Sequence, residues 1–299
     1  MRADRPSATA HLIARSLVFL SSEQPYAALI PPGAAELSIW CMEACSSHTV
    51  RLLRWMRRRR FREMLWNSER AGLPGMMLHY AVRKLWLEDV TRTALADGYR
   101  QVVVLGAGFD TLAPRLAREF PEVRFFEVDH PGTQVVKERA LLAHDGLPGN
   151  LSLVALDLTR ESLGDGIRRA PEFSPAASTL FIAEGLLMYL VEAEVAQLFQ
   201  CCRLHGGPTP RVAFTFMERA SDGRVSFRGQ KRLVDVWLRL RGEPFRWGLE
   251  QEAMPAFLKA QGFTCAAVAT PDVLRARYLS GPEWEGIPLA DGDHPCLAV

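Results

Sequence analysis

Apolar and polar residues follow one pattern from Tyr99 onward, where short apolar runs rich in β-branched residues alternate with helical stretches. Runs of this kind are typical of parallel strands that are buried on both faces and joined by helices. The predicted strands are 101–105, 123–128, 151–156, 178–183, 211–217, 262–269 and 296–299. The predicted helices between the early strands are 112–119, 132–143 and 192–203. The pattern therefore predicts an α/β fold with a Rossmann-like, doubly wound, mostly parallel seven-stranded sheet.

A different pattern fills residues 1–98, where helical periodicity is interrupted by prolines and glycines and no period-2 strand is found. We expect a helical N-terminal lid that contributes to the acceptor region, followed by a nucleotide-binding core over residues 99–299. Within the core, residues 218–250 hold no clear strand but contain a basic helical stretch at 230–241. This segment is predicted to be an insertion that covers the ends of the strands.

Composition excludes several classes of protein. The 299 residues are 48% hydrophobic, and 36 basic residues face 34 acidic ones, for a net charge of +2. A chain of this kind can bury a large core but has no global basic field, so no nucleic-acid partner is expected. Six cysteines without metal spacing predict reduced thiols in the cytoplasm and no metal site. Neither a signal peptide nor a membrane span is predicted.

The most informative segment is Gln101-Val-Val-Val-Leu-Gly-Ala-Gly-Phe-Asp-Thr-Leu112. Gly106 and Gly108 allow a tight turn and a close approach of the backbone to a ligand, with a helix N-terminus directed at the same place. Glu127 lies in the next predicted strand and Asp129 directly follows it, 19 and 21 residues beyond Gly108, which is about the spacing at which an acidic side chain accepts hydrogen bonds from ribose hydroxyls. The segment therefore predicts a nucleotide site.

Two details select the nucleotide. Thr111 stands where dinucleotide-binding loops carry their third glycine, and Asp110 would place a negative charge beside a pyrophosphate. A cationic nucleoside without phosphate suits this loop better, so S-adenosylmethionine is the predicted cofactor.

Further carboxylates follow later strands. Asp157 and Leu158 come directly after 151–156, and Glu184 follows 178–183. Ligands gather at the carboxyl ends of strands in such sheets, so these residues are candidates for binding the nucleoside. Asp157 alone is equally compatible with a helix N-cap. Glu184 lies in an apolar context and needs a partner, which is either Arg83 or the ligand.

Four blocks of sequence together resemble the leucine carboxyl methyltransferase family of S-adenosylmethionine-dependent enzymes. They are Val104-Leu-Gly-Ala-Gly-Phe-Asp-Thr111, Phe126-Glu-Val-Asp129 with Pro131 and Lys137, Asp157-Leu158, and Ala183-Glu-Gly-Leu-Leu-Met-Tyr-Leu190. The start of the chain, Ser7-Ala-Thr-Ala10 with Ala14-Arg15, is similar to the bacterial branch of the family, which methylates polyketides.

The resemblance implies a role for each matching residue. Gly106 would contact the methionine part of the cofactor, Asp129 the ribose, Asp157 and Leu158 the adenine, and Glu184 the ammonium group. In the family's Y-x-x-R setting, Tyr80-Ala-Val-Arg83, Arg83 would bind a carboxylate of cofactor or acceptor. Tyr189 would lie beside the acceptor, so Arg83 and Tyr189 are the predicted catalytic residues.

The chain departs from the family at Gln24-Pro-Tyr-Ala27, where an acidic residue is usual, and at Leu112, where arginine is common. Acceptor specificity is therefore not transferred. A carboxylate acceptor needs no base, whereas a phenol or enol requires one, for which His79 and His130 are candidates beside their structural roles.

The sequence as a whole predicts a cytoplasmic S-adenosylmethionine-dependent O-methyltransferase of secondary metabolism, acting on a carboxylate or hydroxyl of a small, polyketide-like metabolite. Two alternatives are a protein C-terminal carboxyl methyltransferase and a tRNA-base methyltransferase that uses the basic run Arg57–Arg62. A third is a protein that binds S-adenosylmethionine without transferring its methyl group. No oligomeric state is predicted.

Overall fold

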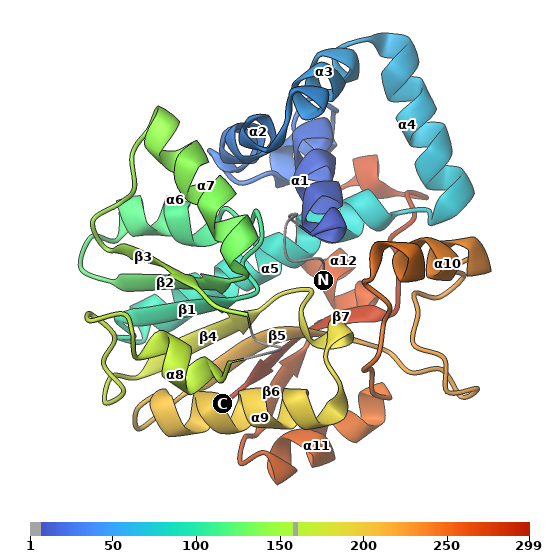
Figure 1. The fold of residues 1–299 in the computed structure, drawn as a ribbon. Helices are drawn as coiled ribbons and strands as arrows, with labels where there is room; N and C mark the ends of the chain where they lie inside the picture. Colours follow the sequence, from blue (N-terminus) through green and yellow to red (C-terminus); the bar gives the residue numbers. More distant parts are fainter. Residues whose placement is uncertain (1–6, 158–160) are drawn as a thin grey trace.

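The structure is a computed structural model and describes residues 7–157 and 161–299. Its centre is a seven-stranded sheet in the order β3-β2-β1-β4-β5-β7-β6 (Figure 1). The strands are β1 (Gln101–Leu105), β2 (Arg124–Asp129), β3 (Leu151–Ala155), β4 (Thr179–Ala183), β5 (Arg211–Met217), β6 (Cys265–Val268) and β7 (Asp293–Ala298). The predicted fold is confirmed, and each predicted strand coincides with an observed one to within a few residues.

Pairing in the sheet is parallel except at one edge. The strands β1 to β5 pair in parallel, and β7 runs antiparallel to both β5 and β6. Because the order reverses between β1 and β4, the carboxyl ends of these strands flank the point where α/β proteins bind ligands.

Successive side chains of each strand point to opposite faces and form two hydrophobic cores. Val102, Val104 and Ile182 pack in one core, and Val103, Leu105 and Phe181 pack in the other. The first face is covered by α5 (Met76–Ala96), α6 (Leu112–Glu119), α7 (Pro131–His144) and α12 (Pro271–Tyr278). The second face is covered by α8 (Leu163–Ile167), α9 (Glu192–His205) and α11 (Met254–Ala260), as Figure 1 shows.

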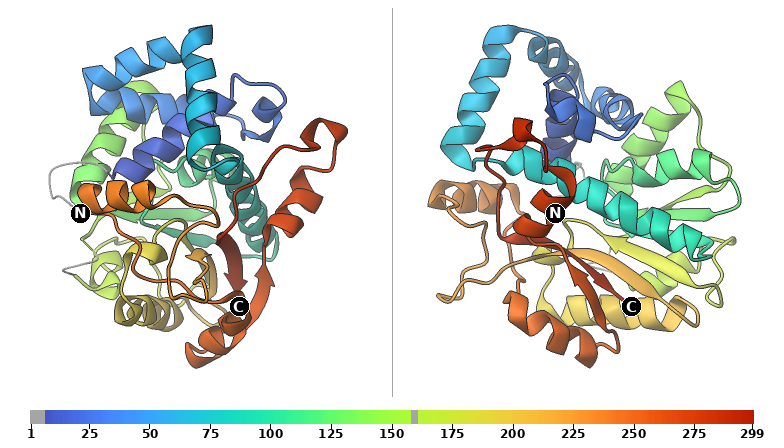
Figure 2. Two further views of the ribbon diagram at one scale, coloured as in Figure 1. Left: turned by 90° about the vertical axis from the view of Figure 1, so that its right-hand side faces the viewer. Right: turned by 180° about the vertical axis from the view of Figure 1, so that it is seen from behind.

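The N-terminal region is helical. Its elements are α1 (Ala8–Leu20), η1 (Tyr26–Leu29), α2 (Ala34–Cys45), α3 (Ser47–Met56), α4 (Arg59–Gly72) and α5. Helix α1 packs against α2 and α5, and α2 packs against α7 of the core. Figure 2 shows α1 to α4 gathered on one side of the molecule, beside the ends of the central strands, whereas α5 runs along the sheet.

The segment 218–250 contains α10 (Arg232–Arg241) within the predicted basic stretch. Isolated bridges join Glu218 to Leu249 and Arg219 to Val225, and Leu249 N donates a 3.0 Å hydrogen bond to the carbonyl oxygen of Met217, so the end of the segment returns to the end of β5. Three short 3-10 turns complete the elements, namely η2 (Leu187–Tyr189), η3 (Gln251–Ala253) and η4 (Pro282–Trp284). Helices α8, α11 and α12 were not predicted; α8 and α11, with five and seven residues, are too short for a clear helical period.

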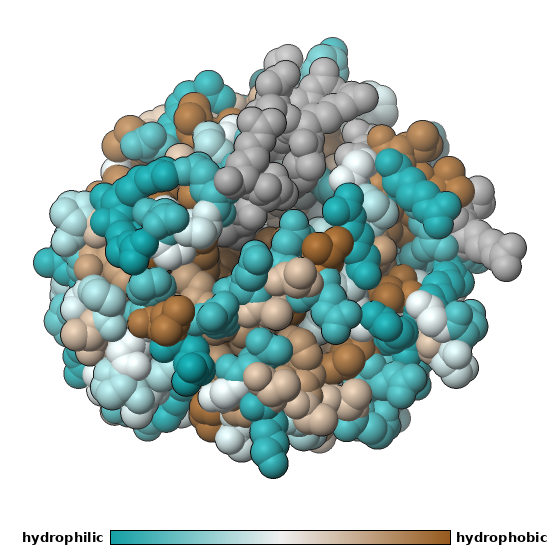
Figure 3. All heavy atoms as spheres, turned by 60° about the horizontal axis from the view of Figure 1, so that its bottom comes forward, coloured by the Kyte–Doolittle hydropathy of each residue, from teal (hydrophilic) through white to brown (hydrophobic). Residues whose placement is uncertain are grey.

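Apolar side chains lie mainly in the interior. On the face drawn in Figure 3, hydrophobic residues are scattered between hydrophilic ones. Among the described residues, no helix combines the length and apolar character that a membrane span requires.

Candidate active site

The turn after β1 requires glycine at two positions. Gly106 and Gly108 have φ values of 64° and 52°, in the left-handed region that favours glycine. A Cβ on Gly106 would lie 2.9 Å from Leu186 Cδ1, and one on Gly108 would lie 3.1 Å from the Cβ of Ala10. Helix α1 therefore rests directly on the glycine turn, which joins the N-terminal region to the core at this point.

Asp129 lies at the end of β2, beside the same turn. Its carboxylate accepts hydrogen bonds from the backbone N–H groups of Gly108 and His130. Burial raises the pKa of Asp129, and the two N–H donors partly offset this effect. The side chain is thus held in one orientation at the mouth of the turn, as a ribose-binding carboxylate would need to be.

Glu127, the other acid of β2, is excluded from this role by its position. It is fully buried, and its Oε2 lies 2.5 Å from Lys137 Nζ. Burial raises the pKa of Glu127 to about 7 despite the nearby ammonium. Lys137 also donates a 2.6 Å hydrogen bond to the carbonyl oxygen of Asp110, so this pair supports the glycine turn from beneath.

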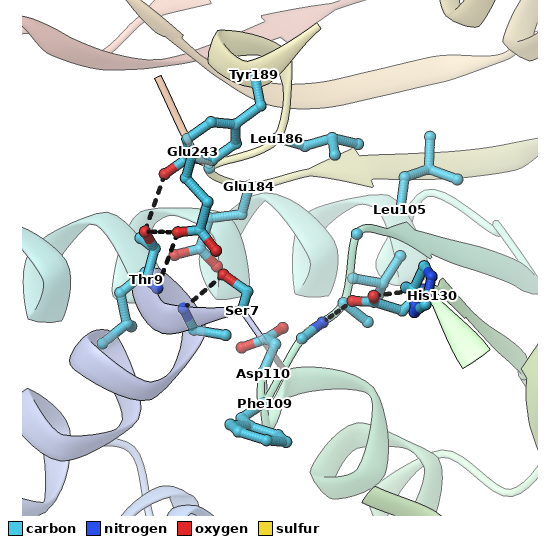
Figure 4. A pocket seen from close by; sticks show the side chains of 18 of the residues that line it. Ser7, Thr9, Leu105, Phe109, Asp110, His130, Glu184, Leu186, Tyr189 and Glu243 are labelled. Atoms are coloured by element: carbon cyan, nitrogen blue, oxygen red, sulfur yellow. Dashed lines mark hydrogen bonds between the residues drawn. The ribbon is translucent and has the colours of Figure 1, made fainter. Parts of the chain in front are cut away.

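A first cavity of about 240 Å³ opens at the carboxyl ends of β1, β2 and β4. Figure 4 shows its polar side chains converging from α1, the glycine turn and the segment after β4. The predicted residues that line it are Gly106, Gly108, Asp129, Asp157, Glu184 and Tyr189. Leu158 lies outside the described residues. Arg83 does not line this cavity, whereas Lys84 does.

Glu184 is held by two cations of helix α5. Arg83 Nε donates a 2.9 Å hydrogen bond to Glu184 Oε1, and Lys84 Nζ donates a 2.9 Å bond to Oε2. The Arg83 partner of Glu184 is therefore confirmed, and Lys84 is a second partner that the sequence did not indicate. Arg83 Nη1 also lies 2.6 Å from Asp293 Oδ2, so both arms of its guanidinium are engaged by protein carboxylates.

These contacts change the predicted role of Arg83. The side chain is only 2% exposed and is bound to Glu184 and Asp293. The predicted direct contact of Arg83 with a ligand carboxylate would have to break one of these buried pairs, which is costly. The geometry instead makes Arg83 a residue that positions Glu184.

Asp110 is not the isolated negative charge that the sequence implied. Its Oδ1 accepts a 2.6 Å hydrogen bond from Lys84 Nζ. Burial alone would raise its pKa, but the ammonium groups of Lys84 and Lys137 lower the pKa of Asp110 to about 2. Repulsion of a pyrophosphate by Asp110 is thus weaker than predicted, because Lys84 neutralises much of its charge.

The described network nevertheless retains a negative balance. Three carboxylates, of Asp110, Glu184 and Asp293, face two cations, Arg83 and Lys84. His79, which lies 3.0 Å from Asp293, adds no full charge at neutral pH because burial lowers its pKa. A cationic ligand is therefore favoured next to Glu184.

The depressed pKa of Asp110 predicts a loss of stability in acid. Its ion pair is present above the unfolded pKa of about 3.9 and is lost as the pH falls towards 2. We expect about 2 kcal/mol of unfolding free energy to disappear over this window. Urea unfolding of the parent and of Asp110→Asn at several pH values checks this. The variant should show a flatter acid slope, and equal slopes would contradict the assignment.

The segment 218–250 closes the first cavity through Glu243. This carboxylate accepts hydrogen bonds from the backbone N–H groups of Ala8 and Thr9, at 3.0 and 3.2 Å, and from Thr9 Oγ1 at 2.6 Å. Tyr189 in turn donates a 3.2 Å hydrogen bond to Thr9 Oγ1. Figure 4 shows this chain of contacts at the start of α1. The sequence gave no signal for Glu243, because its partners lie more than 230 positions away.

A second cavity, of about 620 Å³, adjoins the first. Thr9, Ile13, Gly185 and Tyr189 line both. Most of its other lining residues are apolar, and they include Leu12, Phe19, Leu65, Leu73, Met76, Met77, Met188, Phe227, Leu238 and Phe245. Arg83 contributes to this cavity, and Tyr80 lies over its guanidinium at 5.2 Å.

Arg15 is the one charged group lining the second cavity that forms no ion pair or hydrogen bond with any residue the structure describes. Burial lowers the pKa of this half-buried guanidinium. Glu69 is the acid in the wall of the second cavity. Its carboxylate lies at the first backbone N–H groups of α5, and burial raises its pKa. Arg15 is therefore available to a ligand of the second cavity.

Neither candidate histidine is placed to deprotonate an acceptor. His79 is fully buried and lines neither cavity. His130 lines the first cavity, but its Nδ1 accepts a 3.1 Å hydrogen bond from Gly132 N as the cap of α7. It also stands on the side of Asp129 and Asp157, away from the wall that the two cavities share.

The basic run at 57–62 lies where α3 meets α4. Arg57, Arg58, Arg59 and Arg60 are exposed, with Arg58 over the ring of Trp55 at 5.5 Å. Arg59 pairs with Glu63 at 2.9 Å, and Arg62 pairs with Glu23. None of these arginines lines either cavity.

Known proteins resemble this chain in sequence and in fold. A relative from Mycobacterium avium, assigned by name to the S-adenosyl-L-methionine-dependent methyltransferases, is 31% identical over 208 residues, covering 68% of this chain and 67% of the relative. A relative from Bacillus subtilis with the same assignment is 27% identical over 202 residues, covering 66% and 65%. The chain thus spans about two thirds of the length of these relatives.

Among solved structures, one from Thermobifida fusca, named for methyltransferase activity, superposes with a TM-score of 0.60 over 98% of this chain and 94% of its own. At 14% identity this likeness supports the fold alone.

The fold and the pocket at the strand ends define a methyltransferase of the α/β class. Residues 44–203, more than half of the chain, match the leucine carboxyl methyltransferase family. The chain therefore belongs to the leucine carboxyl methyltransferase family, and the predicted class, an S-adenosylmethionine-dependent methyltransferase, is confirmed.

Proposed function

We propose that the protein transfers a methyl group from S-adenosylmethionine in the first cavity to an oxygen of a small, largely apolar acceptor in the second. One observation carries this proposal, namely the wall of Thr9, Ile13, Gly185 and Tyr189 that lines both cavities. A methyl group presented at that wall would face an acceptor directly, as an in-line displacement requires.

The first cavity suits the cofactor part by part. Asp129 would accept hydrogen bonds from the ribose, Asp157 with Leu158 would contact the adenine, and Gly106 the methionine backbone. Glu184 would attract the ammonium group, because its network has one more carboxylate than cations. The same negative balance favours the sulfonium over a neutral or anionic ligand.

The second cavity favours an acceptor that is already ionised. Burial raises the pKa of Tyr189, so its hydroxyl stays protonated at neutral pH and acts as a hydrogen-bond donor rather than a base. Neither His79 nor His130 reaches the shared wall, and Glu69 faces the start of α5. Alignment and exclusion of water would then supply most of the rate, which is sufficient for a carboxylate nucleophile.

Arg15 supports an acceptor that carries an anionic group. A charge-assisted hydrogen bond to this guanidinium is worth about 1.5–3 kcal/mol, or roughly tenfold to a hundredfold in binding. We expect Arg15→Leu to raise the KM for the acceptor by about tenfold while the affinity for S-adenosylmethionine stays unchanged.

Steady-state kinetics with the identified acceptor, together with calorimetry of cofactor binding, measure both quantities. The matched control is Arg51→Leu, which removes an exposed arginine of α3 that lines neither cavity. A KM equal to that of the parent would remove Arg15 from the acceptor site.

Incubation of the purified protein with methyl-labelled S-adenosylmethionine and an extract of its host tests the proposed function. A labelled, base-labile product that partitions into organic solvent is expected, since methyl esters hydrolyse in base. The Asp129→Ala variant, which we expect to bind the cofactor poorly, is the negative control. Cofactor binding without any labelled product would favour a binding protein, and a labelled RNA or protein would favour another acceptor.

A further inference from the structure

A second group of polar side chains lies at the antiparallel edge of the sheet, apart from both cavities. It consists of Glu218, which directly follows β5, of Asp291, two residues before β7, and of His294, the second residue of β7. One ligand atom from each lies within 4.8 Å of the others. We propose that these three residues form a binding site for a divalent transition-metal ion of the zinc type.

His294 is the observation that points to a ligand. Its side chain is only 2% exposed, and neither ring nitrogen has a hydrogen-bond partner among the described residues. A buried polar nitrogen without a partner is costly, so native proteins rarely leave one unsatisfied. A metal ion would satisfy Nε2, the nitrogen that is directed at the two carboxylates.

The distances separate a metal site from a hydrogen-bonded cluster. His294 Nε2 lies 3.5 Å from Glu218 Oε2 and 3.7 Å from Asp291 Oδ1. Both are longer than an ordinary hydrogen bond to nitrogen. Ligands bound to zinc at 2.0–2.2 Å in a tetrahedron are about 3.3–3.6 Å apart, which is close to the separations found here.

Arg228 neutralises part of the cluster from its outer side. It contacts Glu218 Oε2, the oxygen that also faces His294, at 2.8 Å, and the Oδ2 atom of Asp291 at 3.1 Å, so Glu218 Oε2 would be shared between the guanidinium and an ion. The Oδ1 atom of Asp291 is the one that faces His294, so the ion would bind on the opposite side of that carboxylate from the guanidinium. The Arg228 side chain is 65% exposed, and its exposed pairs can yield to water at small cost.

The backbone around the cluster is tightly built. Gly292 has a φ of 105°, and a Cβ there would lie 3.0 Å from the Cα of Phe227. Glu218 N donates a 2.7 Å hydrogen bond to Gly292 O, so the two ligand-bearing segments are already fixed to one another. An ion here would link β5 to β7. Because Asp293 lies between Asp291 and His294, the ion would also hold this partner of Arg83 in place.

Sequence spacing did not predict this site, since its ligands come from two distant segments and no metal was expected. The proposal is independent of the methyl-transfer reaction. It also differs from a catalytic metal site, because none of the three residues lines either cavity.

Calorimetric titration of the tag-free, chelator-treated protein with zinc chloride tests the proposal. One ion per chain is expected, with affinity at least about tenfold weaker in His294→Gln and in Asp291→Asn. Asp291 is partly exposed, so its variant guards against misfolding of the histidine variant. His48→Gln, which alters an exposed histidine of α3, should bind like the parent.

Two further readouts do not depend on activity. Cobalt should give the visible absorption of a tetrahedral site without a thiolate charge-transfer band, which would otherwise indicate the free cysteines. Zinc should raise the Tm of the parent but not of the Asp291 variant.

Arg228→Gln keeps all three ligands and should retain the ion. Loss of zinc in this variant as well, or equal affinity in parent and ligand variants, would overturn the proposal.

Discussion

Asp129→Ala is expected to weaken S-adenosylmethionine binding by at least about 100-fold, since each hydrogen bond to a charged group contributes about 1.5–3 kcal/mol. The carboxylate lies at the mouth of the first cavity and is held in place by the N–H groups of Gly108 and His130. Its loss would remove the proposed acceptor of the ribose hydroxyls and free the turn that carries Gly108. Isothermal titration calorimetry measures the effect.

The matched control is Asp145→Ala, which removes an exposed aspartate at the end of α7 that pairs with Arg118. This variant should bind the cofactor like the parent. Circular dichroism shows whether both variants fold. An Asp129 variant that is folded and binds with parental affinity would refute the ribose assignment.

The largest loss of stability is expected for Arg83→Leu. Its guanidinium is 2% exposed and holds Glu184 and Asp293, both of which would be left buried without this partner. Breaking a buried ion pair from one side costs about 3–5 kcal/mol. Urea unfolding monitored by fluorescence should show a loss of this size, together with weaker cofactor binding because Glu184 is no longer positioned.

Helix α5 offers a matched control for this variant. Arg92→Leu breaks pairs with Glu88 and Glu119, but the Arg92 side chain is 37% exposed. Exposed pairs contribute at most about 1 kcal/mol, so this variant should lose much less stability. Equal losses in the two variants would show that the buried network contributes no more to the free energy of unfolding than an ordinary surface ion pair.

Local patterns were sufficient to predict the sheet. Continuous apolar runs such as 102–105 are buried on both faces, so strand positions follow directly from the sequence. Gly106, Gly108 and Asp129 were predicted for a similar reason, because a turn and the end of the next strand meet by the geometry of a βαβ unit. Short helices such as α8 lack this periodic signal.

Residues that act across the fold could not be predicted in this way. Lys84 follows Arg83 in the sequence, but only the packing of α5 shows that both reach Glu184. Asp293 and Glu243 lie far from their partners along the chain, and Arg15 is distinguished only by lacking a partner among the described residues. The sequence also overstated the repulsion by Asp110, because charge pairing with Lys84 depends on tertiary contact.

The hydrogen bonds from the first turn of α1 to Glu243 have a consequence for the redesign of such an enzyme. One half of the cover over the two cavities comes from the beginning of the chain, and the other half comes from a segment near its end. Grafting either piece alone from a relative would leave an unmatched carboxylate or an uncapped helix. Chimeras intended to change acceptor choice should therefore exchange residues 7–20 and 230–245 together.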